Sequence, residues 1–174
     1  MAFMGKPKTY ENYPCWIILI SNFVSILIYL AGSFIIYQLG LAWLGLYIIY
    51  ILFLEIRVMK KSCVNCYYYG KCCAFGRGKL STLFFKKGNP KNFACRKITW
   101  KSIIPDFLVS IIPFIAGIIL LILKFNWLVL LSVILLLILA SFGNSFVRGS
   151  LACKHCRQRE LGCPAEQLFS KNKK

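Results

Sequence analysis

Two long stretches without strong polarity dominate the pattern of apolar and polar positions. No charged residue occurs from Asn12 to Leu54, a run of 43 positions. This is about twice the roughly 20 residues that an α-helix needs to cross a bilayer, so the run predicts two membrane helices. The expected turn is Gln38-Leu39-Gly40, because a polar residue and a glycine separate two apolar halves.

A second apolar region extends over 103–147 and is interrupted at Lys124-Phe125-Asn126. Together the two regions predict four membrane helices, at about 15–37, 41–58, 103–123 and 127–147. The buried core of a soluble protein would need shorter runs, and the first run is too long for a cleaved signal peptide. The expected fold is therefore an all-α membrane protein, with its four transmembrane helices arranged as two tandem helical hairpins.

Charge fixes the expected orientation of these helices. The chain has 22 Lys and Arg against five Asp and Glu, a net charge of +17. Residues 57–101 hold twelve of the basic residues, the tail from Arg148 holds seven and the N-terminus two, which leaves Lys124 alone on the other side. By the positive-inside rule, both termini and the central loop are expected in the cytoplasm, in a plasma-membrane protein. This placement accounts for the charge, so nucleic acid is not an expected partner.

Two cysteine clusters are the most specific sequence signal. The first contains Cys63, Cys66 and Cys73, and the second contains Cys153, Cys156 and Cys163. Both follow the spacing Cys-x2-Cys-x6-Cys, with an offset of 90 residues, and each comes shortly after an apolar region. Pro14 and Pro105, expected to open the first and third helices, are 91 positions apart.

These landmarks favour an internal repeat of two hairpins, each followed by a cysteine cluster. The expected segments are a first hairpin at 1–58, a basic Cys-rich loop at 59–102, a second hairpin at 103–147 and a basic Cys-rich tail at 148–174. Each unit has an even number of crossings, so the repeat predicts a pseudo-two-fold axis along the membrane normal. The loop and tail would then form one small, irregular Cys-rich module on the cytoplasmic face.

The thiols of this module are expected to bind metal. Cytoplasmic thiols are kept reduced, and paired Cys-x2-Cys spacing allows two thiolates from one turn to reach one metal centre. Cys15 stands apart at the start of the first helix and is expected to pack there. The candidate ligands are Cys63, Cys66, Cys72, Cys73, Cys95, Cys153, Cys156 and Cys163, with His155 as a further candidate.

The sequence leaves the distribution of these ligands open. One expected centre uses Cys63, Cys66 and Cys73 with either Cys72 or Cys95. The second uses the three tail cysteines, completed by the remaining cysteine or by His155, and the loop can also lend a ligand to the tail. All-thiolate sets suit a 4Fe–4S cluster or zinc, and two such centres are expected.

Two functions from different classes follow from this chemistry. The first is iron–sulfur electron transfer between a cytoplasmic partner and a membrane partner. The second is a zinc-clamped scaffold that binds anionic lipid or a protein. Soft-metal transport, thiol redox chemistry and palmitoylation of the cysteines are weaker alternatives. The five scattered acids and single histidine show no catalytic arrangement, so the sequence leaves enzymatic activity open.

The basic residues of the loop predict contacts outside the protein. Near an anionic membrane surface each cation adds about 1 kcal/mol of attraction. The residues expected to contact lipid headgroups are Lys60, Lys61, Lys86, Lys87, Lys97 and Lys101. The same positive surface would attract an acidic redox protein or another acidic partner. Assembly into a homo-oligomer is left open.

Overall fold

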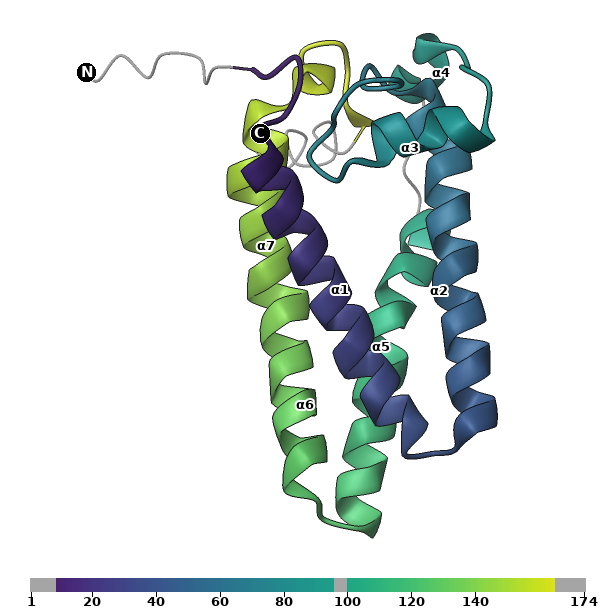
Figure 1. The fold of residues 1–174 in the computed structure, drawn as a ribbon, viewed down its shortest axis with the longest axis vertical. Coiled ribbons are helices and arrows are strands. Elements are labelled where there is room, and N and C mark those ends of the chain that lie inside the picture. Colours follow the sequence, from purple (N-terminus) through teal and green to yellow (C-terminus); the bar gives the residue numbers. More distant parts are fainter. Residues whose placement is uncertain (1–8, 96–99, 165–174) are drawn as a thin grey trace, which may run out of the picture. The chain divides into compact units, whose positions relative to one another are not determined.

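The regular secondary structure of the chain is helical (Figure 1). The computed structural model describes residues 9–95 and 100–164, and within these ranges it contains no strand. The closest approach to sheet pairing there is an isolated parallel bridge between Tyr10 and Cys156. The all-α class expected from the sequence is confirmed.

Four helices within the described ranges are long and apolar enough to cross a membrane. These spans are Cys15–Tyr37, Leu41–Asn65, Ser102–Leu123 and Trp127–His155. Within the described ranges the helices follow in the order α1 (Cys15–Tyr37), α2 (Leu41–Lys61), η1 (Cys63–Asn65), α3 (Arg77–Phe84), α4 (Pro90–Ala94), α5 (Trp100–Leu123), α6 (Trp127–Ile138), η2 (Leu139–Gly143), α7 (Asn144–Phe146), η3 (Val147–Ala152), η4 (Cys153–His155) and η5 (Arg157–Arg159). The number of membrane helices predicted from the apolar runs is therefore confirmed for this part of the chain.

Several boundaries differ from the sequence prediction. The third helix, α5, begins at Trp100, so Pro105 lies inside it and does not open it. The fourth helical segment continues beyond residue 147, because the π-helical turn η3 carries it to Ala152. The loop expected to be irregular contains two short helices, α3 and α4. The helix boundaries differ from the prediction because short helical turns, and prolines inside a membrane helix, change the pattern of apolar residues very little.

The two tight turns that follow α1 and α5 arise from local residue chemistry. Gly40 ends the turn after α1 with φ of +126°, a conformation that strains residues with a side chain. Between α5 and α6, the Asn126 side chain accepts a hydrogen bond from the N–H of Leu128 at 2.9 Å and caps α6. The turn predicted at Gln38-Leu39-Gly40 is thus confirmed.

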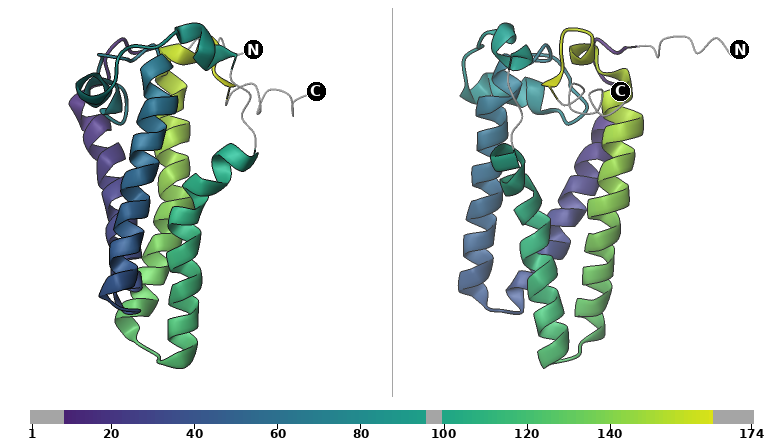
Figure 2. Two further views of the ribbon diagram at one scale, coloured as in Figure 1. Left: turned by 90° about the vertical axis from the view of Figure 1, so that its right-hand side faces the viewer. Right: turned by 180° about the vertical axis from the view of Figure 1, so that it is seen from behind.

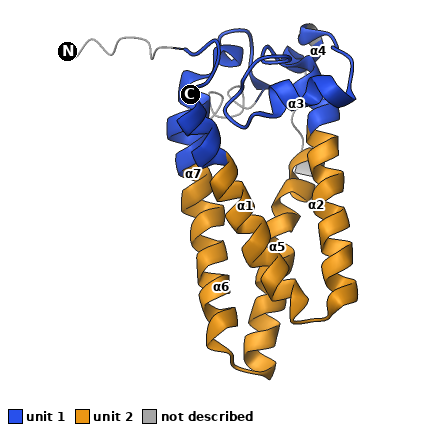
Figure 3. Cartoon of the chain, in the orientation of Figure 1, with its two compact units in different colours: residues 1–21, 59–97, 146–174 blue, residues 22–58, 98–145 orange. Residues whose placement is uncertain are grey.

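The chain divides into two compact units (Figure 3). Unit 1 comprises residues 1–21, 59–97 and 146–174, and unit 2 comprises 22–58 and 98–145. Unit 1 therefore brings the N-terminal segment, the central loop and the tail into one body. Unit 2 contains the greater part of the four membrane helices.

Two apolar clusters hold unit 2 together, and α1 and α5 take part in both. In the first cluster, Ile35 of α1 and Leu136 of α6 are almost fully buried, with Leu120 of α5 packed against them. The second cluster joins Ile36 of α1, Tyr47 of α2 and Val109 of α5. In this unit α1 and α5 consequently form the inner pair, and α2 and α6 pack against them (Figure 1).

Proline breaks the backbone pairing of α5, and a tyrosine of α2 compensates. Pro105 and Pro113 both lie inside α5, which bends in its first half (Figure 2). Pro113 has no N–H to offer the carbonyl of Val109, four residues earlier. The hydroxyl of Tyr47 donates a hydrogen bond to this carbonyl at 2.8 Å. A freed carbonyl is thereby satisfied where no water is at hand.

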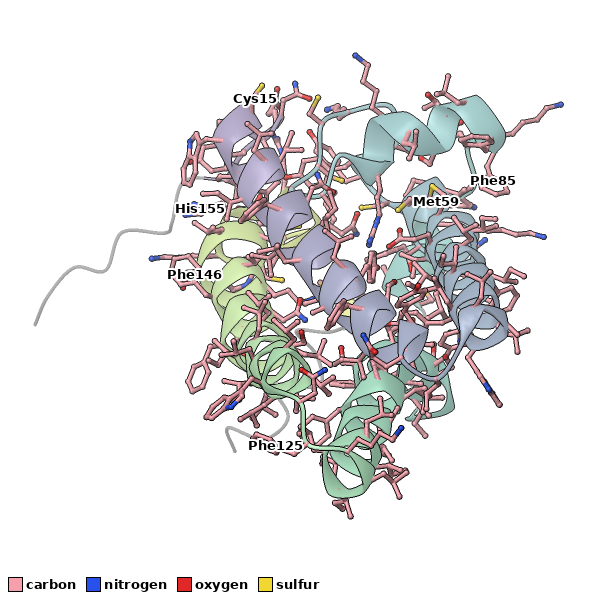
Figure 4. All side chains as sticks on the ribbon, turned by 60° about the horizontal axis from the view of Figure 1, so that its bottom comes forward. Cys15, Met59, Phe85, Phe125, Phe146 and His155 are labelled. Carbon is pink, nitrogen blue, oxygen red and sulfur yellow. The ribbon has the colours of Figure 1, made fainter. Side chains whose placement is uncertain are left out.

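The outer surface of the helices suits contact with lipid. Large exposed apolar side chains occur on all four, including Leu19, Leu30, Phe53, Ile122 and Leu131. Phe125, labelled in Figure 4 in the turn between α5 and α6, is also exposed. Such a surface would be costly in water and is the ordinary boundary of a bilayer-spanning bundle.

Candidate metal centre

The two Cys-x2-Cys segments form the same backbone turn. In the first, the N–H of Cys66 donates to the carbonyl of Cys63 at 3.2 Å, through the 3₁₀ turn η1. In the second, the N–H of Cys156 donates to the carbonyl of Cys153 at 3.3 Å, through η4. In both turns the carbonyl of the second cysteine then accepts an N–H three residues later, at 3.1 Å. Identical spacing has therefore produced matching local geometry.

The two turns exchange a reciprocal pair of hydrogen bonds. The N–H of Tyr67 donates to Oε1 of Gln158 at 2.7 Å. The N–H of Arg157 donates to the hydroxyl oxygen of Tyr68 at 3.0 Å. Tyr67 and Arg157 each directly follow the second cysteine of their pair, and Tyr68 and Gln158 are the next residues. Positions 90 residues apart thus play equivalent parts, which ties the loop to the tail.

The N-terminal segment lies between the two clusters and bonds to both. The N–H of Tyr10 donates to the carbonyl of His155 at 3.0 Å, and the N–H of Tyr13 donates to that of Cys72 at 2.9 Å. The hydroxyl of Tyr13 reaches the carbonyl of Ala152 at 2.5 Å. Asn12 accepts the N–H of Cys72 at 3.1 Å. Three distant parts of the sequence therefore share one hydrogen-bond network in unit 1.

Helix α3 begins beside one of the candidate thiols. Gly76, with φ of +69°, precedes the helix, and the N–H of Gly78 donates to Sγ of Cys73 at 3.3 Å. A Cβ on Gly78 would lie 2.1 Å from the carbonyl oxygen of Tyr68 and 2.6 Å from that of Lys71. Glycine is consequently required for this close approach.

Burial and thiol neighbours act together on Cys66. Burial raises the pKa of Cys66 to about 11, a hydrogen bond from the N–H of Tyr68 opposes this, and the nearby thiols of Cys63, Cys73 and Cys163 add to the increase. The last of these neighbours belongs to the tail. A second negative charge close by makes ionisation harder, and it is this mutual repulsion that a bound cation removes.

Cys156 has a similar environment in the second turn. Burial raises the pKa of Cys156 to about 11, the N–H groups of Gln158 and Arg159 lower it through hydrogen bonds, and the thiols of Cys66 and Cys153 raise it. Cys66 is therefore an electrostatic neighbour of thiols from both clusters. The electrostatic neighbours of Cys66 and Cys156, together with these two residues, are six of the eight predicted cysteines: Cys63, Cys66, Cys73, Cys153, Cys156 and Cys163.

The remaining candidates are placed differently. Cys95 is exposed, although the preceding Ala94 lies close to Gly162, the residue before Cys163. Cys72 contributes its backbone to the hydrogen bonds with Asn12 and Tyr13. The ring of His155 stacks at a tilt on Tyr10, with centroids 5.0 Å apart. These positions leave the roles predicted for Cys72, Cys95 and His155 as predictions.

Few buried apolar side chains stabilise unit 1, the unit that contains these thiols. The main buried cluster of unit 1 is formed by Tyr13, Ile17, Tyr68, Ala74 and Ala152, and Met59 and Val147 of this unit are also buried. Two of these residues are alanines, and the tyrosines are engaged in hydrogen bonds. So small an apolar core supplies little of the free energy that a fold requires. A cross-link through metal would offset this shortage.

No ready-made ion site appears in the described ranges. Among residues 9–95 and 100–164, no group of three or more His, Cys, Asp and Glu side chains is arranged to hold a metal ion. All nine cysteines fall within these same ranges and are free of disulfide bonds.

Comparison with protein families, curated proteins and solved structures finds no match for this chain. The function is therefore inferred from the chemistry of these residues themselves.

The lysines predicted to contact lipid are placed only in part. Lys60, Lys61, Lys86 and Lys87 are exposed. Lys97 and the side chain of Lys101 lie outside the described residues. The exposed lysines are free to approach a charged surface, and their contact with headgroups stays a prediction.

The sequence prediction missed the residues that join the clusters. Tyr10, Asn12, Tyr13, Tyr68 and Gln158 make these joins through hydrogen bonds between residues far apart in the chain. The 90-residue offset was the available signal for Tyr68 and Gln158, because it makes them equivalent positions. No comparable signal exists for the N-terminal segment.

Proposed function

We propose that this chain is a membrane metalloprotein in which thiolates from both cysteine clusters bind metal. The observation that carries the proposal is the set of neighbours around Cys66, which includes Cys63 and Cys73 from the loop and Cys163 from the tail. A chain in a reducing compartment gains little from gathering thiols unless they ligate a metal or react. The matched turns at Cys63–Cys66 and Cys153–Cys156 support ligation, since Cys-x2-Cys spacing in one turn is typical of cysteine metal ligands.

The metal we propose is an iron–sulfur cluster that carries single electrons. The N–H of Gly78 donates to the sulfur of Cys73, and backbone N–H groups also reach the sulfurs of Cys66 and Cys156. Hydrogen bonds to cluster sulfurs are among the factors that set the reduction potential. The positive loop and tail would attract an acidic electron-transfer protein. One or two 4Fe–4S clusters agree with the number of candidate thiols.

Zinc is the second candidate, and a separate observation favours it. The main buried cluster of unit 1 contains few large side chains, and three chain segments meet in this unit. Structural zinc sites supply folding free energy to small bodies of this kind. In this alternative, the metal clamps the loop to the tail, and the basic surface binds lipid or a partner protein.

Metal content of the purified protein distinguishes these candidates. The protein is purified in detergent without oxygen, and its absorption spectrum, iron, acid-labile sulfide and zinc are measured. A broad visible band that bleaches on reduction, with matching iron and sulfide, supports the cluster. Stoichiometric zinc in colourless protein supports the clamp and contradicts electron transfer. Protein purified from metal-supplemented cells that contains neither metal contradicts the proposal.

Replacement of single cysteines tests the ligands. Cys66→Ser is expected to remove most of the bound metal, because Cys66 neighbours thiols of both clusters. Cys15→Ser is the matched control, since Cys15 is an exposed thiol at the start of α1. Equal metal content in the two variants would show that Cys66 is not a ligand.

The arrangement in the membrane completes the proposal. We propose two tandem hairpins in the plasma membrane, with both termini and the cysteines in the cytoplasm. The positive-inside distribution of 22 basic residues supports it. A fluorescent protein fused after residue 174 should fluoresce, and alkaline phosphatase inserted at residue 125 should be active. The reverse pattern would overturn this orientation.

A further inference from the structure

Helix α3 carries an apolar stripe that no part of the described chain covers. Leu80, Leu83 and Phe84 follow the i, i+3, i+4 spacing of one helix face, and they are 46%, 76% and 67% exposed. Isolated exposed apolar residues are common on proteins, but three on one face of an eight-residue helix form a patch. This stripe therefore needs an explanation separate from the metal site.

The rotation of α3 is fixed by its opposite face. Gly78 and Ser81 are buried, and the carbonyl of Gly78 accepts the N–H of Gly70 at 3.0 Å. Gly78 lies so near the carbonyl of Tyr68 that a Cβ would not fit. The helix consequently cannot turn its apolar stripe inward without breaking this contact. The exposure of Leu83 and Phe84 is a property built into unit 1.

The position of α3 brings the stripe close to the end of a membrane span. The span that contains α2 ends at Asn65, and its last turn is η1. Helix α3 packs directly against η1. Both belong to unit 1. A helix attached in this way to the end of a membrane span lies within reach of the bilayer surface.

Exposed cations flank the stripe. Lys79 lies within α3, and Lys86 and Lys87 follow its C-terminal end; all three are exposed. Residues 59–101 contain no Asp or Glu that would neutralise them. Apolar residues on one face with lysines beside them are the signature of a helix that lies in the membrane interface. The charge favours anionic headgroups over zwitterionic ones.

We propose that α3 is an interfacial anchor, with Leu80, Leu83 and Phe84 inserted among anionic lipids of the bilayer that the protein spans. The lysines contact headgroup phosphates, and the apolar side chains lie at the level of the upper acyl chains. This anchor holds the cysteine-bearing loop against the membrane surface whether or not the thiols carry metal.

Photo-crosslinking in lipid nanodiscs tests the anchor. Phe84 or, as control, Thr82 is replaced by p-benzoylphenylalanine in the full chain. Thr82 is the matched position because it lies on the same helix with its methyl group near Gly70, away from the stripe. The nanodiscs contain phosphatidylcholine alone or mixed with anionic phosphatidylglycerol, and adducts are identified by mass spectrometry.

The expected result is abundant lipid adduct from position 84 and little from position 82. Two changes should lower the yield of lipid adduct at position 84: omitting phosphatidylglycerol, or replacing both lysines in a Lys86→Glu, Lys87→Glu variant. The expected decrease is about fivefold for each lysine whose attraction to anionic headgroups is removed. Equal yields at the two positions, or crosslinks from position 84 to a second copy of the chain, would overturn the proposal. Metal content is measured on the same samples, so failure of the metal proposal does not affect this result.

Discussion

At the scale of single residues, close packing at Gly78 is the most demanding feature of unit 1. The carbonyl oxygens of Tyr68 and Lys71 occupy the space that a Cβ would need. Both contacts are with backbone, which cannot rotate away as a side chain can. The loop therefore depends on glycine at this position for steric reasons alone, because Gly78 does not have positive φ.

We expect Gly78→Ala to destabilise unit 1 by about 1–3 kcal/mol, the usual cost of overpacking a tight contact. Limited proteolysis of the loop and denaturant unfolding both measure this effect. Gly149→Ala is the matched control in the same unit, since a Cβ there meets no atom within 4 Å. If the two variants unfold alike, the close approach at Gly78 is not a feature of the folded protein.

The thiols of Cys66 and Cys156 predict a loss of stability at high pH in metal-free protein. Both pKa values are raised from 9.0 to about 11. Between these values the unfolded chain releases protons that the folded chain retains, so the free energy of unfolding falls as pH rises from about 9 to 11. Bound metal would already have displaced these protons, and the fall should then be absent.

Denaturant titrations of chelator-treated protein at several pH values measure this fall. The Cys66→Ser, Cys156→Ser double variant removes the two thiols and should show a shallower decline. Cys15→Ser serves as control and should keep the full decline. A double variant that declines as steeply as the unaltered protein would show that other groups cause the effect.

At the scale of helices, two tyrosines of α2 bond to backbone carbonyls of α5. Tyr47 satisfies the Val109 carbonyl that Pro113 leaves without an N–H donor. The hydroxyl of Tyr50 donates a second hydrogen bond from α2 to α5, to the carbonyl of Pro105 at 2.8 Å. The apolar pattern predicted α2 and α5 as membrane helices, but this pairing depends on neighbours that only the fold supplies.

Tyr47→Phe is expected to cost about 1 kcal/mol of helix association, a typical value for a hydrogen bond between membrane helices. The loss should shrink in a Pro113→Ala background, where residue 113 regains an N–H for the Val109 carbonyl. Steric-trapping measurements of unfolding in bicelles give the four free energies of this double-mutant cycle. Additive losses would show that Tyr47 and Pro113 do not act on one carbonyl.

At the scale of the whole molecule, the sequence predicted those features that depend on the combined properties of residues close together in the chain. Apolar runs located the four membrane helices because transfer free energy accumulates along a helix. Equal spacing predicted two equivalent turns, and η1 and η4 show matching hydrogen bonds. Pro105 misled the prediction of the start of α5, because proline is tolerated inside a membrane helix as well as in its first turn.

Contacts between distant segments could not be predicted in this way. Tyr10 and Tyr13 bond to residues more than fifty positions away, and neither has a local pattern that marks it. The offset of 90 residues identified the cysteines as equivalent without indicating that Cys163 lies near the loop thiols. Composition and spacing therefore predicted which residues are candidate ligands, whereas which of these residues are neighbours could be read only from the fold.

The reciprocal bonds between the two turns give the last prediction. Gln158 is buried and accepts the N–H of Tyr67, while Tyr68 accepts the N–H of Arg157 and donates to the carbonyl of Tyr10 at 2.5 Å. Gln158→Ala and Tyr68→Phe each leave a backbone N–H without its partner, at a cost of about 1–3 kcal/mol. Each variant should therefore release the tail from the loop and speed tryptic cleavage at Arg157 and Arg159.

Glu160→Ala is the control for these variants, because Glu160 is an exposed residue of the same tail. Its cleavage rate should equal that of the unaltered protein. In the Gln158→Ala, Tyr68→Phe double variant, the combined effect should be smaller than the sum, because both bonds hold the same pair of turns together. Unchanged cleavage in both single variants would mean that the turns are not joined, and a metal centre shared between loop and tail would then lose its structural basis.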